Sequence, residues 1–276
     1  MDPQGTEDFH GESLLKTGSL VLDQPHVLGC LLAITFLAWL YLLSMALFQM
    51  ADLGVPEMDD MTAKALVMAP AAWSVSELLM TASMWIVMMA SMMLPSAIPM
   101  ILVFADWSGK SNGSSVATPS FVLGYFMVWI GFAIAALAAH WLLSYFGMLQ
   151  PEMKVASGIA GGCIFVATGV YEWSPLKSRC LANCQNPREF IAEHWRPGLA
   201  GALRTGLSHG VYCLGCCWAL MLLLFAVGVM NLVWVAALSL LVLLQKLLPR
   251  GEWLARASGL AMFAAGVYLI VAEAGF

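Results

Sequence analysis

Long apolar segments constrain the fold of this chain more than any other feature of its sequence. A window of about 19 residues, the length of an apolar helix that crosses a bilayer, finds several of them. The longest, 206–248, is too long for one span, and the turn-forming stretch GVMN at 228–231 divides it. The sequence therefore predicts an all-α bundle of about seven transmembrane helices, at 26–49, 78–104, 121–148, 155–171, on both sides of the break within 206–248, and at 255–275.

Composition agrees with a membrane protein and argues against several other classes. Of the 276 residues, 61% are hydrophobic and 11% are charged, whereas soluble domains contain about 45–50% apolar and about 25% charged residues. A net charge of −5 and dispersed basic residues do not indicate nucleic-acid binding. The sequence has no phosphate-binding glycine loop, HExxH motif or GxSxG motif. These absences argue against an ATP-driven pump, a metalloprotease and a GxSxG hydrolase, and we expect a lipid-embedded binding protein more than an enzyme.

The distribution of basic residues predicts the orientation in the membrane. With seven spans, ten of the twelve lysines and arginines fall on one side, and cytoplasmic loops are enriched in these residues. The polar segment 1–26 is then a cytoplasmic tail without the basic start of a secretory signal. Residues 27–276 form the membrane domain, and 173–205 is a cytoplasmic loop. The ten residues are Lys16, Lys110, Lys177, Arg179, Arg188, Arg196, Arg204, Lys246, Arg250 and Arg256, against Lys64 and Lys154 outside.

Five cysteines fall in two groups on the predicted cytoplasmic side. Cys180 and Cys184, the loop pair, lie in the loop, and Cys213, Cys216 and Cys217, the helix triplet, lie about two turns into the fifth span. Residues three or four apart share one face of a helix, so each group can present its thiols together. Because the cytoplasm keeps thiols reduced, this location favours metal binding or catalysis over structural disulfides.

The candidate ligands are compatible with more than one metal ion. His209 lies four residues before Cys213 and extends the same stripe. Two groups of soft ligands separated by a loop resemble a structural zinc site, and thiolates suit Cu(I) equally well. The spacing matches no standard zinc finger. Simple packing is the alternative, because cysteine is often buried as a small apolar side chain, and the isolated Cys30 and Cys163 fit that interpretation.

Methionines recur at every fourth residue of the second apolar segment, at Met80, Met84, Met88 and Met92, with Met89 and Met93 beside them. Thioethers bind Cu(I) and hold zinc poorly, so Met84, Met88 and Met92 are candidate ligands along a route for a soft ion. A stripe of methionines at helical spacing also serves helix packing, which we favour for these residues. Glu77, at the start of the same segment, is either a functional acid or a helix-start carboxylate.

Three motifs together resemble a bacterial family of predicted metal-binding integral membrane proteins, some of which are labelled copper chaperones. They are MWIVMMASMMLPSAIPM, YEWSPLKSRCLANCQNP and GLSHGVYCLGCCWALM, and the similarity extends from about residue 30 onward. The resemblance implies a helical protein of the bacterial inner membrane with a metal site in its cysteine motifs. By position, the loop pair, the helix triplet and Lys177 match residues of the family.

These observations lead to one working hypothesis and two rivals. We expect a multi-pass membrane protein that binds Cu(I) at its thiols and exchanges it with a copper-receiving or metal-delivering protein. Zinc or iron fits better if the methionine stripe is only packing. The first rival is a thiol–disulfide oxidoreductase that uses the CxxC pair Cys213 and Cys216. The second is a scaffold in which zinc only fastens the loop to the bundle.

Overall fold

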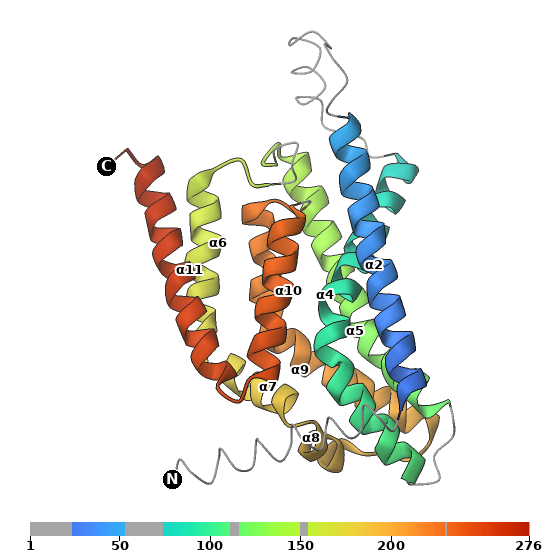
Figure 1. Cartoon of the computed structure of the whole chain (residues 1–276). Helices are drawn as coiled ribbons and strands as arrows, with labels where there is room; N and C mark the ends of the chain where they lie inside the picture. Colours follow the sequence, from blue (N-terminus) through green and yellow to red (C-terminus); the bar gives the residue numbers. More distant parts are fainter. Residues whose placement is uncertain (1–23, 53–73, 111–115, 150–153, 230, 276) are drawn as a thin grey trace.

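The computed structural model describes residues 24–52, 74–110, 116–149, 154–229 and 231–275. Within these ranges the chain forms nine helices and no named strand, which confirms the predicted all-α class. The tail at 1–26 lies almost wholly outside the described residues, so its prediction stays a prediction. Figure 1 shows the helices running side by side, with α2 (Pro25–Asp52) and α11 (Gly251–Glu273) on opposite sides of the bundle.

Helices form at all seven predicted segments, but only five are long and apolar enough to cross a membrane. These five are α2, α4 (Val75–Lys110), α5 (Ala117–Tyr145), α9 (Gly198–Val227) and α11. The other two, α6 (Gly158–Glu172) and α10 (Leu232–Leu247), have 15 and 16 residues. At 1.5 Å per residue they are about 22–24 Å long, less than the roughly 30 Å of a hydrocarbon core.

The break predicted at 228–231 is present between α9 and α10. Gly228 follows the last turn of α9 with a φ of +100°, a backbone conformation that glycine adopts at low cost. The side chain of Asn231 then caps α10 by accepting a hydrogen bond from the backbone N–H of Trp234. By contrast, Pro95 and Pro99 do not end α4, which continues through both to Lys110.

The burial of the helices shows where the core lies. The apolar window of α4 is 67% buried and that of α9 is 61% buried, whereas α2 and α11 are mostly exposed and present apolar side chains outward. Two short helices, α7 (Pro175–Gln185) and α8 (Pro187–His194), lie outside the candidate spans. They lie at the end of the bundle where α10 turns into α11 (Figure 1).

Close contact between α5 and α9 depends on glycine at position 206. A Cβ atom at Gly206 would lie 2.0 Å from the backbone oxygen of Phe121. We expect Gly206→Ala to lower the free energy of unfolding by about 1–3 kcal/mol, because the backbone of α5 must move. The thermal midpoint in detergent measures this change. Gly29→Ala on exposed α2 is the control, since no heavy atom lies within 4 Å of that position; an equal effect of both changes would contradict the packing argument.

Candidate metal centre

The loop pair lies on a well-defined helix, as its spacing predicted. Ser174 caps α7 by accepting a hydrogen bond from the backbone N–H of Lys177, and Pro175 occupies the first turn. Cys180 and Cys184 then lie one turn apart and face inward, with exposed fractions of 8% and 9%. The local sequence therefore folds this part of the predicted loop into a helix that presents both thiols to the bundle.

The helix triplet lies deeper along α9 than the sequence predicted. We expected Cys213 about two turns into its helix, whereas α9 begins at Gly198, so that about four turns precede Cys213. The reason is that residues 198–205, assigned to the loop, continue the helix. Cys213, Cys216 and Cys217 are all buried, with exposed fractions of 2% or less.

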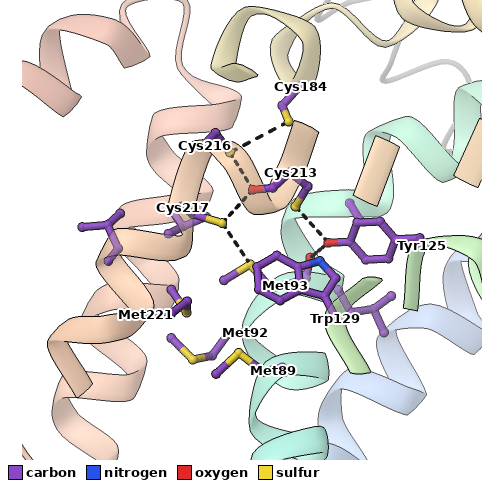
Figure 2. Close-up of a cluster of buried hydrophobic side chains, with 14 of the residues drawn as sticks. Met89, Met92, Met93, Tyr125, Trp129, Cys184, Cys213, Cys216, Cys217 and Met221 are labelled. Carbon is purple, nitrogen blue, oxygen red and sulfur yellow. Dashed lines mark hydrogen bonds between the residues drawn. The ribbon is translucent and has the colours of Figure 1, made fainter. Parts of the chain in front are cut away.

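The structure brings the two cysteine groups together. Cys184 Sγ of α7 lies 3.9 Å from Cys216 Sγ of α9 (Figure 2). Gly215 leaves space for the other member of the loop pair, because a Cβ atom there would lie 2.7 Å from Cys180 Sγ. Thiols separated by 32 residues in sequence thus share one interface between a short helix and a bundle helix.

The remaining thiols of the triplet contact other soft or polar groups. Cys217 Sγ lies 3.7 Å from the thioether sulfur of Met93. Cys213 Sγ lies 3.2 Å from the hydroxyl oxygen of Tyr125 and accepts a hydrogen bond from Lys246 Nζ at 2.9 Å. The centre is therefore a row of sulfur atoms with one phenol and one ammonium at its side.

The distance between Cys184 and Cys216 fits a bound soft ion. Two sulfurs at about 2.3 Å from one ion are about 3.8 Å apart in a tetrahedral centre and about 4.6 Å apart in a linear one. The observed 3.9 Å lies within that range. Among the described residues, no three His, Cys, Asp or Glu side chains converge as a ready-made metal site. At 3.9 Å the two sulfurs are nearer to the tetrahedral spacing than to the linear one, so the distance is compatible with Cu(I) and with zinc alike.

Burial affects the thiols of α7, which lies outside the candidate spans. It raises the pKa of the Cys180 thiol above its ordinary value, and the neighbouring Cys216 raises it further. The pKa of Cys184 is raised mainly by hydrogen bonding with Cys213 and Cys216 and then by burial. Both side chains are therefore thiols at neutral pH, and binding of a metal ion by them releases protons.

His209 lies among aromatic rings rather than against the sulfur atoms. Its ring is stacked near Phe121 and Tyr125, with centroids 6.1 and 5.4 Å away, and Phe190 approaches edge-on. It is buried, and neither ring nitrogen has a hydrogen-bond partner among the described residues. Its predicted role as a ligand stays a prediction.

The methionines of α4 lie in two different environments. Met89, Met92 and Met93 belong to the same buried cluster as the thiols, together with Met221 of α9 (Figure 2), and Met93 contacts Cys217. Met84 and Met88 instead line a small apolar pocket between α2 and α10. Sequence spacing selected Met84, Met88 and Met92 and left Met93, which contacts Cys217, at the edge of the stripe.

Glu77 behaves as a helix-start residue. Its carboxylate accepts hydrogen bonds from the backbone N–H of Ser74 at 2.7 Å and from the Ser74 hydroxyl at 2.8 Å. Ser74 in turn accepts from the backbone N–H of Glu77 at 3.3 Å. This reciprocal pair is a capping box at the first turn of α4, which accounts for the acid without a metal.

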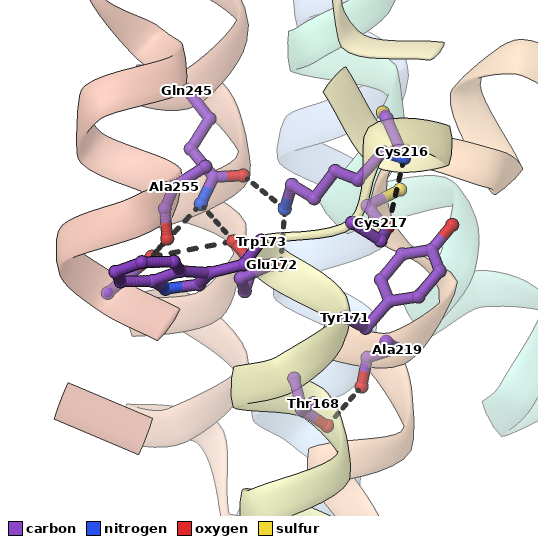
Figure 3. A network of polar contacts seen from close by, with 12 residues as sticks. Thr168, Tyr171, Glu172, Trp173, Cys216, Cys217, Ala219, Gln245 and Ala255 are labelled. Atoms are coloured by element: carbon purple, nitrogen blue, oxygen red, sulfur yellow. Dashed lines mark hydrogen bonds and ion pairs between the residues drawn. The ribbon is translucent and has the colours of Figure 1, made fainter. Parts of the chain in front are cut away.

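A buried polar network holds α7 in place. Lys177 Nζ donates to Glu172 of α6 and, at 2.9 Å, to the side-chain oxygen of Gln245 of α10 (Figure 3). Gln245 donates back to Glu172 at 3.0 Å, and Ser258 of α11 contacts both. Gln185, at the other end of α7, donates to the backbone oxygen of Gln245 at 2.8 Å. The network joins four helices next to the loop pair, and of its residues the sequence analysis named only Lys177.

Fold and site together define the class of protein, a helical protein with five candidate membrane spans and a buried, sulfur-rich centre between a short helix and the bundle. Comparison with protein families then identifies the family of the chain. The family model PpoB2, described as a copper chaperone, matches residues 82–269, which is more than half of the chain and includes both cysteine groups. The chain belongs to this family, as the three motifs predicted. No match was found among curated proteins or among solved structures.

Proposed function

We propose that this protein binds one Cu(I) ion between α7 and α9 and exchanges it with a partner protein. The observation that carries the proposal is the 3.9 Å contact between Cys184 Sγ and Cys216 Sγ, which joins cysteines from two separate elements. Membership of a copper chaperone family supports copper as the cargo. Thiolates are soft ligands that bind Cu(I) as well as zinc, and the family membership is what favours copper here.

The position of α7 supports exchange rather than permanent storage. This helix lies outside the candidate spans, so its side of the centre is nearer to a partner than α9 is. A soft ligand of the partner adds to the ion, and one thiolate of this chain then leaves. The ion changes ligands without gaining or losing an electron, and the departing thiolate takes up a proton from solvent.

The arrangement of the helices supports the predicted orientation. We propose that α6 and α10 also cross the membrane, which gives seven crossings with a cytoplasmic N-terminus in the bacterial inner membrane. Helices α7 and α8 and the turn from α10 to α11 lie at one end of the bundle (Figure 1). That end carries most of the basic residues, so the sulfur centre would face the cytoplasm.

The methionines extend the proposed site along α4. Met93 contacts Cys217, and Met89 and Met92 lie beside it. Met88 and Met84 follow at one-turn intervals farther from the thiols, where they line the small pocket. Thioethers at this spacing could bind a Cu(I) ion on its way between the thiols and the opposite end of the bundle.

Elemental analysis of the purified protein tests the proposal. We expect about one equivalent of copper in the wild type and almost none in Cys213→Ser/Cys216→Ser/Cys217→Ser. Cys30→Ser/Cys163→Ser is the matched control, because both of these cysteines are exposed and separate from the centre. Zinc in place of copper would favour the structural scaffold. No metal together with a Cys213–Cys216 disulfide would contradict metal binding and favour thiol–disulfide exchange.

A further inference from the structure

His209 is a buried polar residue whose nitrogens are not used by the fold. Its side chain is 2% exposed, and neither Nδ1 nor Nε2 has a hydrogen-bond partner in the part of the chain that the structure describes. Most buried polar groups are paired, and an unpaired one destabilises the fold. An apolar ring would pack among Phe121, Tyr125 and Phe190 without that cost. A ligand that binds there transiently would account for the imidazole.

His209 lies between the sulfur centre and a surface pocket, on one face of α9. Thr205, His209, Cys213 and Cys217 recur at every fourth position of this helix and are all buried, so they share a face. Thr205 lines a pocket of about 380 Å³ between the end of α8 and the first turns of α9. His209 is therefore one turn, about 6 Å along the helix axis, from both the pocket and the first thiol.

A second histidine lines the pocket in a form that can bind a metal ion. His194, the last residue of α8, has its Nδ1 3.0 Å from the backbone oxygen of Phe190. Because a carbonyl oxygen only accepts hydrogen bonds, Nδ1 of the neutral ring carries the proton and Nε2 keeps its lone pair. Histidines that bind metal ions are commonly held in this way. His194 Nε2 is therefore a candidate ligand at the surface end of the face.

Phe190 contacts both imidazoles. Its ring is stacked on His194 with centroids 4.4 Å apart, and it meets His209 edge-on at 5.6 Å. It is 1% exposed, and it belongs to a helix of eight residues that lies outside the candidate spans. Rotation of this one side chain would therefore change the connection between the pocket and the buried imidazole.

We infer that Cu(I) enters and leaves the sulfur centre through this pocket, by binding in turn to His194 Nε2 and to His209, with Phe190 as the gate between them. The inference rests on the proposed function and names the route by which that ion is exchanged. Neutral imidazole is a ligand for copper and has no proton to lose on binding. At each step the ion gains one ligand and loses another without electron transfer, and a thiol that takes it up gives its proton to solvent.

The rate of Cu(I) release from the full chain in detergent, measured without oxygen, tests this route. An excess of a chromophoric Cu(I) chelator gives the rate, and competition at equilibrium gives the affinity. His209→Phe keeps an aromatic ring but removes the ligand atoms, and we expect release to slow by at least about tenfold while the affinity stays within about threefold. Phe190→Leu lowers the barrier between the imidazoles, and we expect release at least about threefold faster at the same affinity.

The opposite directions of these effects separate the inference from a structural role. Loosened packing would weaken binding and speed release in both variants. If His209→Phe does not fold, His209→Gln is expected to slow release equally, because an amide is a poor ligand for Cu(I). His26→Gln, at an exposed position of α2, is the control and should release at the wild-type rate. An unchanged rate at position 209, or a fall in affinity that accompanies a faster release, would overturn the route. A wild type that holds no Cu(I) would instead contradict the proposed function.

Discussion

Replacing either Cys184 or Cys216 with serine is expected to lower the affinity for Cu(I) by more than about 100-fold. Replacing a residue that only hydrogen-bonds to a metal ligand lowers metal affinity by about 10–100-fold. Here a coordinating sulfur itself would be lost, so a larger effect is expected. The double variant is expected to be little worse than either single one, because a site shared by two sulfurs fails when either is absent. Competition with a Cu(I)-specific chromophore measures all three affinities.

This double-mutant comparison tests whether the site lies between two elements. Cys30→Ser removes an exposed thiol and is expected to keep wild-type affinity. A fall in affinity for Cys216→Ser with no change for Cys184→Ser would place the ion on α9 alone. Independent, additive losses would indicate two separate sites and would contradict the interface described above.

Lys177→Met is expected to reduce the free energy of unfolding by about 3–5 kcal/mol, because it leaves Glu172 buried without its cation. Lys177 and Glu172 side chains are 1% and 0% exposed. Adding Glu172→Gln to the same variant removes the unpaired charge and is expected to restore at least half of the loss. Thermal or denaturant unfolding in detergent, followed by circular dichroism, gives the values.

An exposed ion pair provides the control for this prediction. Lys110 pairs with Asp106 at 2.8 Å, and its side chain is 75% exposed. Lys110→Met should therefore cost less than about 1 kcal/mol. If Lys177→Met cost no more than Lys110→Met, the buried network could not be what holds α7 against the bundle, and the loop pair would need another anchor.

Much of the fold follows from local sequence, because apolar length, glycine and capping residues act over a few positions. The stretch around Gly228 divides two apolar helices as predicted, and the pair at 180 and 184 lies on a short helix. Helix ends were predicted unevenly. The end of α6 at Glu172 lies one residue past the predicted end, whereas α9 begins at Gly198, eight residues before the predicted start of its apolar segment at 206.

The site, like the fold, combines features that local sequence predicts with features that depend on how the helices pack. Spacing of three and four residues predicted which thiols share a helix face, and these are local relations. The contact of Cys184 with Cys216 and that of Lys246 with Cys213 depend on how helices pack, and no periodicity encodes that choice. The methionines illustrate the limit: several faces of α4 carry thioethers, and only packing against α9 selects Met93.

The short helices α6 and α10 have a consequence for the surrounding lipid. A bilayer adapts to a short apolar helix by local thinning, and both helices end on the side of α7. Head groups and water would dip toward the last turn of α10, where Lys246 meets the thiols. A thiol in the middle of α9 would then be separated from the aqueous phase by less hydrocarbon than its depth along the helix implies. Acyl-chain length would in this way become part of what controls access to the ion.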